Sequence, residues 1–299
     1  MGSNPQIPSE DYGPVRQGAE PEVLTPEYQG YAAPPPVRRR KPTWAIAPAT
    51  YLLLGINCAV FVAMALRGVN PLNPSPEQLL QQWGANNAGY VLFLGQWWRI
   101  ITAMFVHVGF LHLATNMWCL WNLGLLAEPL MGSFGVFAEY ILTGAAGNLL
   151  STMVNFLSNS AELARYHDLG VFPAGAGASG AVFGIAGALI VLLKSRQLPV
   201  PPEEVRKLRR SVIYFAVINL VIGGGITIGT NVIGSGIHID NMAHLGGVTC
   251  GLLFATPMVP RLGAPRALFE RRLRVSVGLI VTLLVLFGYF LSRLVIPVH

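Results

Sequence analysis

A serine and a histidine stand where they could act together as a nucleophile and its base. Ser179 lies among glycines and alanines at the start of an apolar run, and His244 opens another apolar run. A serine hydroxyl is a poor nucleophile until a base takes its proton, and neutral histidine is the usual base near pH 7. Asp240 precedes His244 by one helical turn, at the edge of its run, where it can serve as a helix N-cap. The pair therefore favours a Ser-His dyad over a triad.

A second polar pair could stabilise the oxyanion that forms when serine attacks a carbonyl. His112 and Asn116 are i and i+4, so they share one face of a helix. Oxyanions are commonly stabilised by a backbone N–H together with amide or imidazole donors. The backbone N–H of Ser179 is a third candidate, because N–H groups at a helix start have no intrahelical acceptor.

The glycines before Ser179 also match a phosphate-binding pattern. Gly175, Gly177 and Gly180 fit G-x-G-x-x-G, which binds dinucleotides only between a strand and an amphipathic helix with an acidic residue farther on. Here the following run is apolar on every face and is closed by Lys194 and Arg196. The context favours a serine at the start of a membrane helix.

Composition places most of the chain in a membrane. Of 299 residues, 53% are hydrophobic and 11% are charged, with a mean hydropathy of +0.51. A soluble domain carries about 25% charged residues, so a polytopic all-α membrane protein is predicted. The net charge of +6 does not predict a nucleic-acid or nucleotide partner, because the basic residues follow the membrane topology. The three cysteines form no C-x-x-C pair, so neither a disulfide framework nor a metal site is expected.

Seven apolar runs are near the roughly 20 residues that cross a bilayer. They cover residues 44–66, 111–130, 134–157, 177–193, 211–230, 241–259 and 275–294. The segment 67–110 is too long for a turn and is rich in aromatic residues. It predicts a structured loop in the membrane interface, where amphipathic rings settle.

The distribution of basic residues predicts the orientation. Residues 1–42 are rich in proline, end in Arg38-Arg39-Arg40-Lys41 and predict a disordered tail. This tail and the segments between runs four and five and between runs six and seven hold 16 of the 20 Lys and Arg residues. By the positive-inside rule the N-terminus is cytoplasmic, and the plasma (inner) membrane is the expected location.

This orientation brings the polar groups to one depth. Runs two, four and six all cross from outside to inside, and each opens with one of these residues, so they should face a common wet cavity. Runs four and six must then pack closely. Small-xxx-small pairs that permit close approach occur on both, at Gly180 with Gly184 and at Gly247 with Gly251.

These motifs resemble those of the rhomboid intramembrane serine proteases. The resemblance covers roughly residues 44–260, in the family's order. It is carried by Gly177-x-Ser179-Gly180, His112-x-x-x-Asn116, Ala243-His244-x-Gly246-Gly247 with Gly251, and Trp98-Arg99 in the first loop. It implies a six-helix core at 43–260, preceded by the tail and followed, at 261–299, by a basic cytoplasmic loop and one added transmembrane helix.

The resemblance also implies roles for the residues. Ser179 would be the nucleophile and His244 the base, with His112, Asn116 and the Ser179 N–H as the oxyanion hole. A transmembrane protein would be cut near the outer face through an acyl-enzyme, without cofactor or metal.

Four further residues are expected to have supporting roles if the chain resembles a rhomboid protease. His107 matches another family histidine, for which a loop-anchoring role is favoured over catalysis. Phe183 stands where many relatives have a tyrosine that packs on the catalytic histidine. Arg99, beside Trp98, is expected to hold its loop rather than bind phosphate. Glu128, four residues before Gly132 in a family turn motif, is expected to bond a helix end.

Three other functions fit parts of the sequence. A rhomboid-like pseudoprotease would bind membrane helices, but it is expected to lack the serine or the histidine. A transporter would show inverted repeats or polar groups across the midplane. A zinc protease could use His107, His112 and His244, but the chain has no H-E-x-x-H.

Overall fold

The computed structural model describes residues 46–166, 168–194, 201–233, 240–261 and 265–294. The tail assigned to residues 1–42 lies outside these ranges. The described residues form helices and no strand apart from one isolated bridge between Asn86 and Gly175. The elements are α2 (Pro48–Leu66), α3 (Pro76–Trp83), α4 (Ala88–Leu92), α5 (Arg99–Thr102), η1 (Ala103–Phe105), α6 (Phe110–Tyr166), η2 (Leu169–Val171), α7 (Ser179–Leu192), α8 (Pro202–Ile233), α9 (Asn241–Ala255), η3 (Thr256–Arg261) and α10 (Arg266–Leu294).

The fold is that of an all-α polytopic membrane protein. Among the described residues, three helices are long and apolar enough to cross a membrane, namely α2, α6 and α10, and α7 is a shorter apolar helix. The runs predicted at 111–130 and 134–157 form the two helical halves of α6, which are separated by the non-helical backbone of Gly132 (φ 75°, ψ 165°). Glycine adopts this positive φ without steric cost, so the helix is interrupted at Gly132 and the chain changes direction there.

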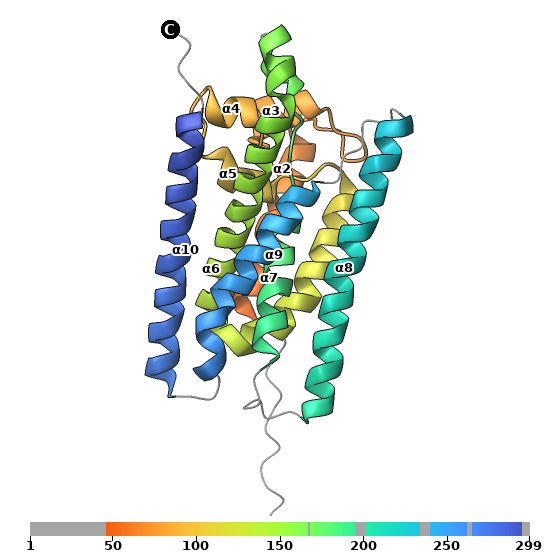
Figure 1. Ribbon diagram of the computed structural model, residues 1–299. Helices are drawn as coiled ribbons and strands as arrows, with labels where there is room; N and C mark the ends of the chain where they lie inside the picture. Colours follow the sequence, from red (N-terminus) through yellow and green to blue (C-terminus); the bar gives the residue numbers. More distant parts are fainter. Residues whose placement is uncertain (1–45, 167, 195–200, 234–239, 262–264, 295–299) are drawn as a thin grey trace, which may run out of the picture. The chain divides into compact units, whose positions relative to one another are not determined.

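The centre of the bundle is built from α6, α7 and α9. Figure 1 shows α7 and α9 side by side, and both pack against α6. Almost every residue of α7 from Gly180 to Leu189 is buried. A Cβ on Gly247 would overlap the carbonyl of Gly180, and a Cβ on Gly251 would overlap that of Gly184. The two backbones are therefore in direct contact, which only glycine at these positions permits.

Glu128 fixes the start of α2 to α6. Its carboxylate accepts hydrogen bonds from the backbone N–H groups of Ala49 and Thr50, both at 2.9 Å, and from the Thr50 hydroxyl at 2.7 Å. A carboxylate at a helix N-terminus satisfies N–H groups without an intrahelical acceptor and interacts favourably with the helix dipole. Helix-end bonding, the role predicted for Glu128, is confirmed.

The long first loop is structured, and Arg99 holds it together. Its guanidinium donates to the carbonyls of Leu80 at 2.6 Å and Ala85 at 2.9 Å. It also lies 4.6 Å from the ring centroid of Tyr90 and 4.7 Å from that of Trp98. Burial lowers the pKa of Arg99, against the opposing effect of Tyr90. These contacts engage the guanidinium inside the loop, in keeping with a loop-holding role.

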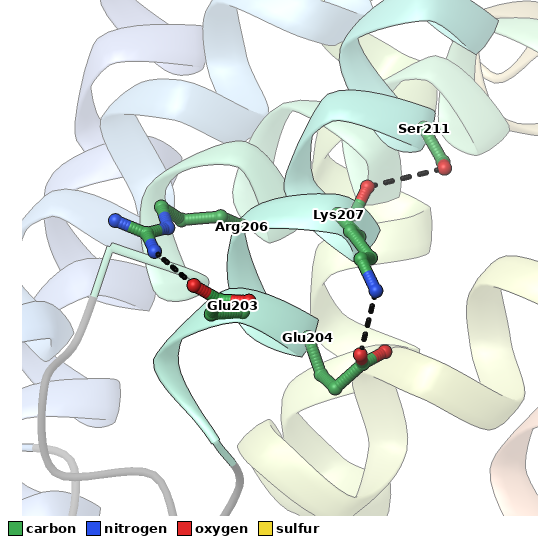
Figure 2. Close-up of polar contacts among 5 residues, drawn as sticks. All are labelled: Glu203, Glu204, Arg206, Lys207 and Ser211. Carbon is green, nitrogen blue, oxygen red and sulfur yellow. Dashed lines mark hydrogen bonds and ion pairs between the residues drawn. The ribbon is translucent and has the colours of Figure 1, made fainter.

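The first turns of α8 are charged and exposed, in contrast to the bundle centre. Figure 2 shows Arg206 beside Glu203 and Lys207 beside Glu204, with N–O distances of 3.4 Å and 2.9 Å. Exposed pairs three residues apart contribute little to stability. Their helix extends beyond the apolar run predicted at 211–230 into the basic segment that precedes it.

Candidate active site

Ser179 is the first residue of α7, and the loop before it is fixed to the first loop. Gly175 and Asn86 exchange two backbone hydrogen bonds, of 2.7 Å and 2.8 Å, and the Gly177 N–H donates to the carbonyl of Ala103 at 3.0 Å. These bonds hold the chain as it enters the helix. The Ser179 N–H lies in the first turn, where N–H groups have no intrahelical acceptor and the helix dipole is positive.

His107 is a hydrogen-bonded histidine beneath this loop. The Ala178 N–H points to its Nε2 at 3.4 Å, and its Nδ1 lies 3.3 Å from the carbonyl oxygen of Phe105. Since an N–H can only donate and a carbonyl can only accept, the ring is neutral with its proton on Nδ1. Burial lowers the pKa of His107 to about 3, and the neighbouring His112 adds to the shift. This geometry fits an anchor for the serine loop.

His112 and Asn116 lie on α6 next to the serine loop. A Cβ on Gly177 would lie 2.6 Å from His112 Cε1 and 3.0 Å from Nε2, so the absence of a side chain there admits the imidazole. Gly177 also has a φ of +131°, which other residues rarely adopt. Asn116 is buried and spends one of its two amide hydrogens on the carbonyl of His112 at 2.9 Å.

His244 lies on the first turn of α9 under an aromatic ring. The rings of Phe183 and His244 are stacked, with centroids 4.2 Å apart and planes 11° from parallel. Nδ1 of His244 is buried without a hydrogen-bond partner among the described residues. Asp240 instead caps α9, accepting from the Ala243 N–H at 2.9 Å, and its other oxygen bonds the Ser151 hydroxyl. A carboxylate that would complete a triad is thus engaged elsewhere.

The serine and the histidine flank one backbone contact. A Cβ on Gly180 would lie 3.3 Å from the carbonyl oxygen of Ala243. Ser179 precedes Gly180 and His244 follows Ala243, so both residues stand next to the place where α7 and α9 meet. Gly180, Gly247 and Gly251 all belong to this contact, while Trp98 and Arg99 belong to the first loop.

The site contains the groups needed for acyl transfer and lacks a metal cluster. The described residues hold no group of three His, Cys, Asp or Glu side chains that could bind a metal ion. A serine, a stacked histidine and N–H donors at a helix start are the components of nucleophilic catalysis with an oxyanion hole.

Sequence reasoning missed two contacts that position these groups. Ser151 on α6 bonds Asp240, and Asn86 bonds both the serine loop and Thr152, whose hydroxyl lies 3.1 Å from its amide nitrogen. The adjacent residues Asn86 and Asn87, in a loop otherwise rich in aromatic residues, could have indicated a polar contact at Asn86. No local pattern marks Ser151, because its partner lies on another helix.

A family model for the Rhomboid domain matches residues 94–261. The chain is 28% identical over 270 residues to the rhomboid protease GluP of Bacillus subtilis, covering 90% of this chain and 44% of that protein. It is 29% identical to RHOMBOID-like protein 1 of Arabidopsis thaliana, covering 62% of this chain and 40% of that protein. It is 32% identical over 216 residues to the rhomboid protease AarA of Providencia stuartii, covering 69% of this chain and 70% of that protein.

The chain spans less than half the length of GluP and of RHOMBOID-like protein 1. The matched family region includes the described parts of α6 to α9 together with His107, His112, Asn116, Ser179 and His244, whereas Asn86 lies before it.

Proposed function

The chain belongs to the rhomboid family, and we propose that it is an intramembrane serine endopeptidase with Ser179 as nucleophile and His244 as base. The observation that carries the proposal is the backbone contact between Gly180 and Ala243. It supports the proposal because Ser179 and His244 are the chain neighbours of these two residues, in the first turns of α7 and α9.

Acyl transfer would proceed in two balanced steps. His244 takes the proton of the Ser179 hydroxyl as the oxygen attacks the substrate carbonyl, and then gives it to the leaving amine as the peptide bond breaks. The resulting acyl-enzyme is hydrolysed by a water molecule whose proton His244 accepts. The stacked ring of Phe183 holds the plane of His244, which supports proton transfer without a carboxylate partner.

The oxyanion would be stabilised by His112, Asn116 and the Ser179 N–H. Gly177 leaves room for the His112 imidazole beside the serine loop, and Asn116 keeps a second amide hydrogen for the oxygen. Removing one such donor typically reduces the rate by about 100- to 1,000-fold. His107 would act on catalysis indirectly, by holding the backbone at Ala178.

The substrate would be a transmembrane protein helix that unwinds near the outer face of the membrane. A helical peptide bond is shielded by its own hydrogen bonds, so local unwinding is needed before its carbonyl reaches Ser179. The family resemblance implies lateral entry between the first half of α6 and α8. The basic residues favour a cytoplasmic N-terminus in a plasma (inner) membrane.

Cleavage of a labelled model transmembrane substrate in liposomes tests this function. We expect the wild type to cut, and Ser179→Ala and His244→Ala to lose at least about 1,000-fold in kcat while keeping the wild-type melting temperature. His112→Ala should retain more activity than either, because the other oxyanion donors remain.

Two results would redirect the proposal. Undiminished cleavage by Ser179→Ala would remove the serine mechanism. If the wild type bound several different transmembrane peptides and cut none, the pseudoprotease reading would replace it.

A further inference from the structure

Helix α10 has two fully buried contacts with the rest of the bundle, and between them Leu284 and Phe287 are partly buried. Near its N-terminal end Leu273, Ser276 and Ile280 are buried, and near its C-terminal end Leu291 is buried. Figure 1 shows α10 alongside α6, with α4 and α5 near its C-terminal end. Between the two contacts most side chains of α10 are exposed or half-buried.

A cavity of about 500 Å³ opens between these contacts. On the core side it is lined by apolar side chains of the first loop and α6, and on the other side by α10. The lining includes Trp97, Ile141, Ala145, Leu149, Leu284 and Gly288. Its volume is in the range of sites that bind small molecules.

The length and volume of this groove indicate which kind of molecule could occupy it. The α10 residues that line the cavity run from Val281 to Ser292, which spans about 17 Å at 1.5 Å per residue. This is close to the roughly 15 Å depth of one bilayer leaflet. A helix about 10 Å across and that long would occupy more than about 1,000 Å³, so the groove cannot enclose a transmembrane helix. An acyl chain has the required width and length.

One end of the groove is polar and positively charged. Tyr289 and Ser292 line it there, and the Arg293 guanidinium lies 5.6 Å from the Tyr289 ring centroid. Among the described residues no carboxylate forms an ion pair with Arg293. An arginine at the interface, beside an apolar slot, is suited to a phosphate group through charge-assisted hydrogen bonds.

We propose that the groove between α6 and α10 holds one phospholipid. One acyl chain lies along Ile141, Ala145 and Leu284, and the phosphate contacts Arg293. The lipid fills the space that the two end contacts of α10 leave open. The site is separate from Ser179 and does not depend on proteolysis.

Native mass spectrometry of the full chain in detergent, with added dioleoyl phosphatidylglycerol, tests the site. We expect the wild type to retain one phospholipid after delipidation. Gly288→Leu should reduce the bound fraction about tenfold, because a Cβ there starts 3.7 Å from Trp97 and a leucine would extend into the groove. Gly278→Leu is the matched control, because this glycine lies on the same helix with nothing within 4 Å.

Variants of Arg293, the proposed phosphate contact, provide a second test in case Gly288→Leu displaces α10. Arg293→Gln alters no buried contact and should weaken retention about tenfold, whereas Arg293→Lys should keep most of it. The proposal fails if the wild type retains no phospholipid. It also fails if Gly278→Leu lowers retention as much as Gly288→Leu, or if Arg293→Gln binds as the wild type does.

Discussion

Two helix contacts in this molecule are built in opposite ways. Helices α7 and α9 meet backbone to backbone at Gly180 and Gly247 and again at Gly184 and Gly251. Helix α10 touches the bundle through side chains, which are fully buried in two places, and a cavity lies beside the helix between these places. In a bilayer, apolar side chains gain little by leaving lipid, so association depends on close packing. The first contact can therefore hold Ser179 and His244 in a fixed relative position, while the second can tolerate different molecules in its cavity.

The largest effect is expected when the same change, glycine to alanine, is made in each of the two contacts. Gly247→Ala places a Cβ on the carbonyl of Gly180, so α7 and α9 must separate. We expect stability to fall by about 3 kcal/mol and kcat to fall about 100-fold, the cost of a displacement near 1 Å. Gly278→Ala on α10 meets open space and should stabilise its helix by up to about 1 kcal/mol. Thermal unfolding and substrate cleavage measure both.

Equal changes in the two glycine variants would contradict the comparison. In that case the contact between α7 and α9 would be as tolerant as the surface of α10, and another feature would have to hold Ser179 near His244.

Acidification provides the second test, through His107. The pKa of His107 is about 3 in the fold and near 6.5 when unfolded, so below pH 6.5 the unfolded chain binds more protons. Its contribution is therefore fully present above pH 6.5 and is lost as the pH falls toward 3. At pH 5 the loss is about 2 kcal/mol. His107→Gln should flatten the fall in melting temperature between pH 6.5 and pH 4.

The quantity to compare between variant and wild type is the slope of the melting temperature against pH. The absolute melting temperature is not suitable, because His107→Gln also changes stability by an amount that does not depend on pH. If variant and wild type lose stability in parallel as the pH falls, the serine loop is not anchored by a neutral His107.

The residues of the candidate site could be predicted from sequence because their chemistry is local. Spacing places His112 and Asn116 on one face, and the apolar run sets Ser179 at a helix start. The small-xxx-small glycine pairs likewise predicted the close contact between α7 and α9. The bonds of Ser151 to Asp240 and of Asn86 to the serine loop could not be predicted, because each joins elements whose placement depends on the whole fold.

The fold shows the same limit. Hydropathy predicted the two apolar runs that form the two halves of α6, but a window of residue types does not register the positive φ of Gly132, which sets how the two halves meet. The cavity beside α10 could not be predicted from the sequence either, because a cavity depends on the distance between helices rather than on the polarity of their residues.

A smaller effect is expected at the cap of α9. Asp240→Ala removes the acceptor of the Ala243 N–H and the partner of Ser151, and should cost about 1 kcal/mol. Because His244 is one turn farther on, kcat should fall as well. Asp240→Asn keeps an acceptor for the cap and is the matched control, expected within about 0.5 kcal/mol of wild type. Chemical unfolding and kcat should rank the two variants in this order, and the reverse order would exclude the capping role.

The smallest effects are expected at the N-terminal end of α10, where two kinds of contact can be compared on one helix. Leu273 is buried near Gly135, whereas Glu270 forms exposed ion pairs with Arg266 at 2.7 Å and Arg274 at 3.6 Å. Leu273→Ala should lower stability by about 1 kcal/mol, since mainly packing is lost in a lipid environment. Glu270→Gln should leave the melting temperature unchanged, because solvent screens exposed pairs. A larger loss in Glu270→Gln than in Leu273→Ala would mean that the ion pairs within α10 contribute more to stability than the packing of Leu273 against the bundle.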